Sequence, residues 1–183
     1  MFSQNDYLYR HNQVAAIVHQ EICHSLGMLK EKTPYYEYKY KPVVQKDHLV
    51  YYDRSIITDR TIACNKPDIV VKDRNKKEAY IIDIAVPNTH NLMSTITEKR
   101  RKYTDLAEEV MNLWNMNKVT VIPIVLSASG VIPPIVLSAT GVIPKDLHKS
   151  LKTLALNNNL GKLMQKAVVL NTTRIVRRFL SQQ

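Results

Sequence analysis

The sequence contains few cysteines and few glycines, and each scarcity argues against a class of protein. Its 183 residues include two cysteines, Cys23 and Cys64, and four glycines. Because neither cysteine belongs to a C-x-x-C pair, the sequence disfavours a disulfide framework and a thiolate zinc site. With 45% hydrophobic residues, the chain is not wholly disordered. Its length predicts a single domain over residues 1–183.

Acidic residues are also scarce, at 16 Asp and Glu against 26 Lys and Arg, which gives a net charge of +10. Most of this excess lies in residues 145–183, where eight basic residues accompany one acid. A basic C-terminal segment favours a polyanionic partner, with nucleic acid first and an anionic membrane surface second. A solvated helix face is the alternative interpretation of the same charge.

Residues 123–133 and 134–144 are a tandem duplication. The copies read PIVLSASGVIP and PIVLSATGVIP and agree at ten of eleven positions. They create a long uncharged tract, but its repeated Pro and Gly residues would break a membrane helix. We therefore expect no membrane span, and instead a buried strand with an 11-residue insert, in which about Val131–Val142 protrudes as a loop or hairpin.

The spacing of apolar residues predicts the order of helices and strands. Residues 1–10 are expected to form an N-terminal tail, and residues 56–62 a short strand or turn. The predicted helices are His11–Leu26, Leu92–Trp114, Lys145–Leu156 and Leu160–Leu180, and the predicted strands are Leu49–Tyr52, Asp68–Lys72, Ala79–Val86 and Val119–Leu126. This order indicates an α/β domain, with a mixed sheet flanked by helices and the duplication at the third clear core strand.

Two carboxylates fall where an apolar strand needs none. Asp68 opens one predicted strand and Asp83 lies inside the next, and a hairpin would bring them together. A carboxylate in an apolar strand is costly unless it is paired or binds a cation. Paired carboxylates suit Mg²⁺ (or Mn²⁺). Alternatively, Asp68 caps its strand, and Asp83 pairs with a buried base, for which the candidates are Arg54, Arg60 and Lys99.

Lys99 projects onto the core face of the long predicted helix, whereas Lys102 lies about 80° away. From there Lys99 could reach the aspartates and neutralise charge on a phosphoryl transition state, or it could snorkel from the helix edge. On the first helix, Glu21 projects onto the apolar face. It is interpreted either as a metal ligand or as a capping or edge residue. The histidines show no metal-ligand spacing and are interpreted as structural: His11, His19 and His24.

These features together resemble a known family. Lys66-Pro67-Asp68, then Asp83, and a helix bearing Lys99-Arg100-Arg101-Lys102-Tyr103 resemble the restriction-like endonuclease domain of site-specific non-LTR retrotransposons, a PD-(D/E)XK-type nuclease. The resemblance extends from Arg10-His11-Asn12 nearly to the end of the chain. Ala85 stands where classical members carry a lysine, so the resemblance implies a migrated lysine, Lys99 or Lys102, beside Tyr103.

The resemblance also implies a function. Asp68 and Asp83 would hold Mg²⁺ or Mn²⁺, and Glu21 matches the general location of a first-helix acid. The implied reaction is hydrolysis of a DNA phosphodiester to leave a 3′-OH, in the nucleus, by the C-terminal part or a descendant of a retroelement polyprotein. The residues expected to contact DNA are Lys162, Lys166, Arg174, Arg177 and Arg178. Two alternatives are an inactive DNA-binding remnant and a membrane-surface or scaffold protein.

Overall fold

The protein is described by a computed structural model that covers all residues except 1–3, 41–42, 45–46, 88–90, 128–144 and 182–183. Its centre is a five-stranded sheet in the order β1-β2-β3-β4-β5. The strands are β1 Val43–Val44, β2 His48–Tyr52, β3 Ile69–Asp73, β4 Glu78–Ala85 and β5 Lys118–Val125. The helices are α1 Gln4–Ser25, α2 Leu92–Lys102, α3 Thr104–Leu113, α4 Lys145–Thr153 and α5 Leu160–Leu180. The predicted mixed sheet flanked by helices is confirmed.

The sheet is mixed because one connection crosses over it. β1 to β4 pair antiparallel in sequence order, whereas β4 and β5 pair parallel, with Asp83 beside Pro123 in the register. A parallel pair needs a long connection, and here α2 and α3 provide it. β5 forms an edge of the described sheet, which is where a strand tolerates the missing N–H of Pro123.

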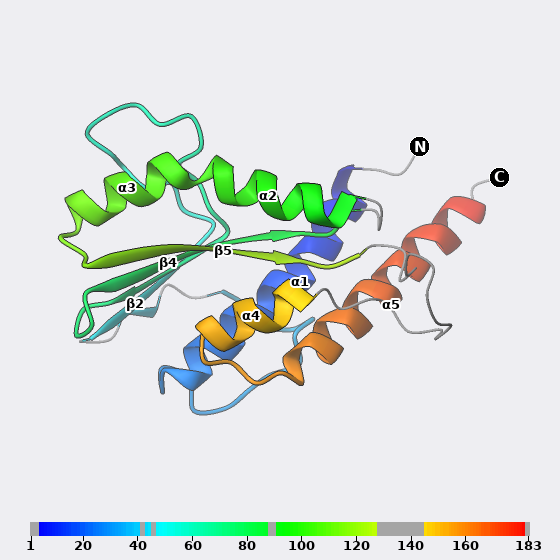
Figure 1. Ribbon diagram of the computed structural model, residues 1–183. Coiled ribbons are helices and arrows are strands. Elements are labelled where there is room, and N and C mark those ends of the chain that lie inside the picture. The colour runs from blue at the N-terminus through cyan, green and yellow to red at the C-terminus, as the bar shows by residue number, and fades with distance from the viewer. Residues whose placement is uncertain (1–3, 41–42, 45–46, 88–90, 128–144, 182–183) are drawn as a thin grey trace.

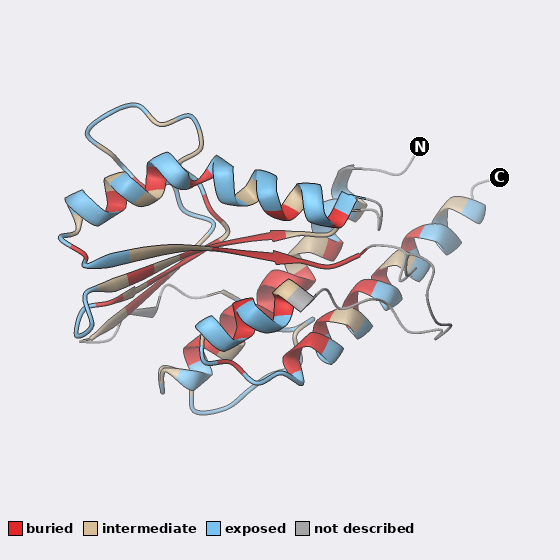
Figure 2. Ribbon diagram, in the orientation of Figure 1, coloured by how far each residue is buried: buried red, intermediate tan, exposed pale blue. Residues whose placement is uncertain are grey.

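The helices form a layer on each face of the sheet (Figure 1). α2 and α3 cover one face, and α1, α4 and α5 cover the other. Side chains alternate between the two cores, as a strand requires: Ile82 and Ile84 pack in the core with α1, while Ala79 and Ile81 pack in the core with α3. Figure 2 shows the buried residues on the strands and on the helix surfaces that face them.

Three helices differ from their predicted bounds, and one of them, α4, ends at Thr153 rather than at Leu156. α1 begins at Gln4, so residues 4–10, expected to be a tail, are helical. The predicted helix Leu92–Trp114 is two helices that meet at Tyr103, whose φ of −108° and ψ of 12° are not helical. The break accompanies the inward turn of the Tyr103 side chain, which is 1% exposed.

The remaining predictions concern residues 56–62, the duplicated segment and the uncharged tract. Residues 56–62 form no strand, and β1 was not predicted. β5 contains Pro123, Ile124 and Val125 of the first duplicated copy. The segment Val131–Val142, expected to protrude, lies outside the described residues. No helix in the described part of the chain is long and apolar enough to cross a membrane.

Candidate functional site

The hairpin of β3 and β4 brings the two aspartates to one end of the sheet. Ile69 pairs with Ile82, so Asp68 and Asp83 occupy the next positions on the two chains. Residues at such opposed positions are close neighbours, and Asp68, which lies just before β3, also faces α1 through its contact with His11. The Asp68 carboxylate also reaches β4 directly, since its Oδ2 accepts the backbone N–H of Ile84 at 2.6 Å.

Asp83 is a buried carboxylate, with 3% of its surface exposed, and it is contacted by lysines of α2. The Lys99 ammonium lies 2.6 Å from Oδ2, and the Tyr103 hydroxyl donates to Oδ1 at 2.6 Å. The Lys102 ammonium lies 3.7 Å from Oδ1. Oδ2 is within ion-pair distance of Lys99 but receives no directed hydrogen bond. The Lys99 ammonium thus holds the place beside this buried oxygen that a metal ion would take, and a metal ion at Oδ2 would have to displace it.

Tyr103 links Asp83 to Lys102 and to the backbone just before Asp68. Its hydroxyl accepts a hydrogen bond from Lys102 Nζ at 2.9 Å and lies 3.1 Å from the carbonyl oxygen of Lys66. Burial raises the pKa of Tyr103, and the hydrogen bond and charge of Asp83 and the charge of Asp68 raise it further. Tyr103 therefore stays protonated. Its hydroxyl donates a hydrogen bond to Asp83, and this bond fixes the orientation of the carboxylate.

His11 approaches Asp68 from the other helix layer. Its Nε2 lies 3.2 Å from Asp68 Oδ2, while Nδ1 donates to Asn12 Oδ1 at 3.2 Å. Burial lowers the pKa of His11, but the hydrogen bond and charge of Asp68 outweigh burial, so the pKa is raised overall. The sequence interpretation of His11 as only structural thus missed a residue of the cluster. A usable signal was its place in Arg10-His11-Asn12, the tract where the family resemblance begins.

Arg10 fixes the position of this part of α1. It is 5% exposed, and its guanidinium donates to Thr172 Oγ1 at 2.9 Å and to the carbonyl oxygen of Val86 at 3.3 Å. Val86 directly follows β4, and Thr172 lies on α5. Arg10 therefore connects α1 to the end of β4 where Asp83 lies, and this contact positions the neighbouring His11 beside Asp68.

The structure brings together five of the sequence-predicted site residues, namely Asp68, Asp83, Lys99, Lys102 and Tyr103. It does not bring Glu21 to them. Glu21 lies ten residues after His11 on α1, about 15 Å along the helix axis, and its carboxylate pairs with Lys32 at 2.6 Å. Of the bases considered for Asp83, Lys99 makes the contact, whereas Arg60 pairs with Glu109 at 2.9 Å.

The predicted DNA-contacting residues of α5 are all exposed but differ in their partners. Arg178 pairs with Asp6 at 3.2 Å, and the Arg174 guanidinium lies 5.0 Å from the centre of the Tyr9 ring. The other three make no ion pair within the described residues: Lys162, Lys166 and Arg177. Since Thr172 contacts Arg10, the C-terminal half of α5 lies at the His11 end of α1, and Lys162 lies about 15 Å further along.

The donor types of the cluster fit a hard divalent cation. In the described part of the chain, no three His, Cys, Asp or Glu residues lie close enough together to surround an ion. Magnesium-type ions, however, often take only one or two carboxylates and complete their shell with water and phosphate oxygens. Asp68 offers Oδ1, because its described side-chain contacts fall on Oδ2. Asp83 offers the incompletely satisfied Oδ2.

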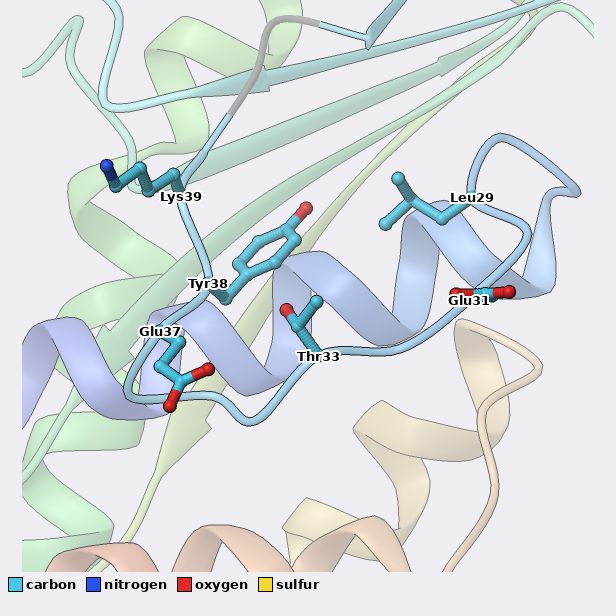
Figure 3. Close-up of a pocket in the computed structure, with 6 residues that line it drawn as sticks. All are labelled: Leu29, Glu31, Thr33, Glu37, Tyr38 and Lys39. Atoms are coloured by element: carbon cyan, nitrogen blue, oxygen red, sulfur yellow. The ribbon is translucent and has the colours of Figure 1, made fainter.

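A separate cavity of about 300 Å³ lies beside the loop that follows α1. Figure 3 shows its lining residues, which are Leu29, Glu31, Thr33, Glu37, Tyr38 and Lys39. The Tyr38 hydroxyl and His19 Nδ1 lie 2.8 Å apart, so this lining residue contacts the core side of α1. The cavity contains no residue of the aspartate cluster.

No protein-family model matches the chain, and no curated protein matches it. Function is therefore argued from the cluster itself, where two carboxylates, two ammonium groups, a tyrosine hydroxyl and an imidazole meet at one end of the sheet.

Proposed function

We propose that this protein is a metal-dependent DNA endonuclease domain of retrotransposon origin, related to the PD-(D/E)XK nucleases. One observation carries the proposal: Lys99 reaches Asp83 from a different element, 2.6 Å from its carboxylate, beside Asp68. Two adjacent carboxylates and an ammonium group are what hydrolysis of a phosphodiester requires, because the acids attract a cation and the base neutralises developing negative charge.

The reaction is hydrolysis at phosphorus. A water oxygen attacks the phosphorus atom, the bond to the 3′ oxygen breaks, and that oxygen takes a proton to become the 3′-OH primer end. A divalent ion bound by Asp68 and Asp83 would polarise the phosphate and acidify a bound water. Lys99 places a positive charge beside the reacting phosphate, and Tyr103 holds the carboxylate of Asp83 in position.

Positive side chains near the cluster support a nucleic-acid substrate. Arg100 and Arg101 are exposed on the same turn of α2 as Lys99, and Lys66, whose side chain is 51% exposed, precedes Asp68 by two residues. Phosphate contacts by such residues supply affinity that falls steeply with salt. The chain would thus hold a DNA backbone beside the aspartates, in the nucleus.

The test is nicking of supercoiled plasmid in Mg²⁺ or Mn²⁺ by the full chain. Asp68→Asn and Asp83→Asn should each lower the rate at least about 100-fold, the scale of losing one electrostatic group from a reaction centre. The matched control is Asp59→Asn, because Asp59 is an exposed acid outside the cluster. Circular dichroism shows whether each variant is folded. Equal nicking by all four folded proteins would refute the proposed active site.

The second candidate is an inactive DNA-binding remnant. It is favoured by the Lys99–Asp83 pair, which neutralises the buried carboxylate without any metal ion, and by the exposed basic residues of α5. In this case wild type does not nick, but gel-shift binding still weakens with salt. Removing three bases together (Lys162→Ala, Lys166→Ala and Arg177→Ala) should reduce the salt slope by up to about three, one for each lost phosphate contact.

A further inference from the structure

We propose that His11 is a metal ligand, and that it makes the site prefer Mn²⁺ to Mg²⁺. This inference rests on the proposed metal-dependent function and adds to it a residue from α1. The donors are His11 Nε2 and an Asp68 carboxylate oxygen, and water and substrate oxygens complete the shell. The observation behind it is the contact of 3.2 Å between the two side chains.

The hydrogen bonds of the imidazole define which nitrogen is available. Nδ1 donates its proton to Asn12 Oδ1, so a neutral His11 carries its lone pair on Nε2. That lone pair points at Asp68 Oδ2. Two acceptors facing each other at this distance repel, so a proton lies between them when no metal is bound, and a metal ion would take the place of that proton. The hydrogen bond of the far nitrogen to the Asn12 oxygen is the kind of contact that orients a metal-bound histidine.

The surroundings hold the two donors in place. The side chains of His11 and Asp68 are 25% and 21% exposed, so an ion and its waters can reach them. The backbone N–H of Ile84 anchors Asp68, and the Tyr40 hydroxyl donates to the carbonyl oxygen of Asn12 at 2.6 Å. With these anchors, little freedom is lost when both donors bind one ion, and this favours binding.

The donor types set the metal preference. Mg²⁺ takes oxygen ligands almost exclusively, whereas imidazole suits the first-row transition metals. A site with one imidazole beside carboxylates therefore favours Mn²⁺, which accepts both. The ratio of Mn²⁺ affinity to Mg²⁺ affinity should fall at least about tenfold when the nitrogen donor is removed, since mutating only the hydrogen-bond partner of a metal-bound histidine already costs about tenfold or more in metal affinity.

The experiment measures metal binding without substrate, so it does not depend on nicking. Mn²⁺ binding to the full chain is followed by electron paramagnetic resonance, and pulsed spectra report whether a histidine nitrogen is bound. Wild type should show nitrogen modulation. His11→Gln should lose the modulation and show the reduced Mn²⁺-to-Mg²⁺ ratio. The control is His24→Gln, an exposed histidine on the same helix, which should match wild type.

The outcomes separate this inference from the proposed function. If Mn²⁺ binding is lost in Asp68→Asn but is unchanged in His11→Gln, with the same spectrum, the ligand role of His11 is wrong and the carboxylate site stands. If wild type binds no Mn²⁺, both are wrong. Unaltered circular dichroism of His11→Gln shows that the fold is retained, and His11→Ala is a second variant with the same expected loss.

Discussion

The hydrogen bond from Tyr103 to Asp83 yields the sharpest stability prediction. Tyr103→Phe removes a single oxygen atom that donates at 2.6 Å to a carboxylate with 3% exposure. A hydrogen bond to a charged group is worth about 1.5–3 kcal/mol, and the carboxylate left behind cannot reach water in compensation. The Lys102 ammonium lies 3.7 Å from Oδ1 of Asp83, and its charge offsets part of this loss. We therefore expect the free energy of unfolding to fall by about 2 kcal/mol.

Urea denaturation followed by circular dichroism measures this change. For a chain of this size, a loss of about 2 kcal/mol corresponds to a melting temperature lower by about 4–8 °C. The matched control is Tyr36→Phe, since Tyr36 is 62% exposed and its change should stay within about 0.5 kcal/mol. If Tyr103→Phe is as stable as Tyr36→Phe, the buried contact with Asp83 contributes nothing and the reasoning about this cluster is wrong.

Two further predictions concern charge. Lys99→Met should lower the free energy of unfolding by about 3 kcal/mol, because it leaves a buried carboxylate without its ion pair. Asp83→Asn should lower it by about half as much, because the ammonium groups left behind can extend into water. Urea titrations that show the reverse order would contradict this. Burial lowers the pKa of His19 to about 4. As the pH falls below about 6.5, this histidine therefore binds a proton in the unfolded chain but not in the folded one. The free energy of unfolding should consequently drop by about 2 kcal/mol between pH 7 and pH 5. His19→Gln should lose that dependence, and an unchanged pH profile in this variant would refute it.

The sequence predicted the sheet well because its strands carry β-branched residues in short runs with clear ends. β3, β4 and β5 were predicted to within one residue at each end. The convergence of Lys99 with Asp83 also followed from helical projection, because the spacing from Ile96 to Tyr103 places Lys99 on the core side. These predictions depend on the spacing of apolar residues within one segment, and that spacing decides which side chains face the core of the folded protein.

The features that the sequence did not predict depend on contacts between distant segments. The break at Tyr103 follows from its bond to Asp83, twenty residues earlier, and no proline or glycine marks it. His11 joins the cluster through Asp68, 57 residues later, and helical spacing alone placed it only near the edge of an apolar face. Glu21, which projected more deeply onto that face, lies away from the aspartates because it is ten residues further along α1 than His11, about 15 Å along the helix axis.

The cluster joins both helix layers at one end of the sheet. α1 contributes His11 to Asp68, and α2 contributes Lys99 to Asp83, so each layer is bonded to one strand of the same hairpin. Neither layer can separate from the β3–β4 hairpin without breaking these charged contacts. Backbone amides in α1 and in α2 should therefore exchange with solvent through the same opening event, so that the molecule unfolds as one cooperative unit rather than layer by layer.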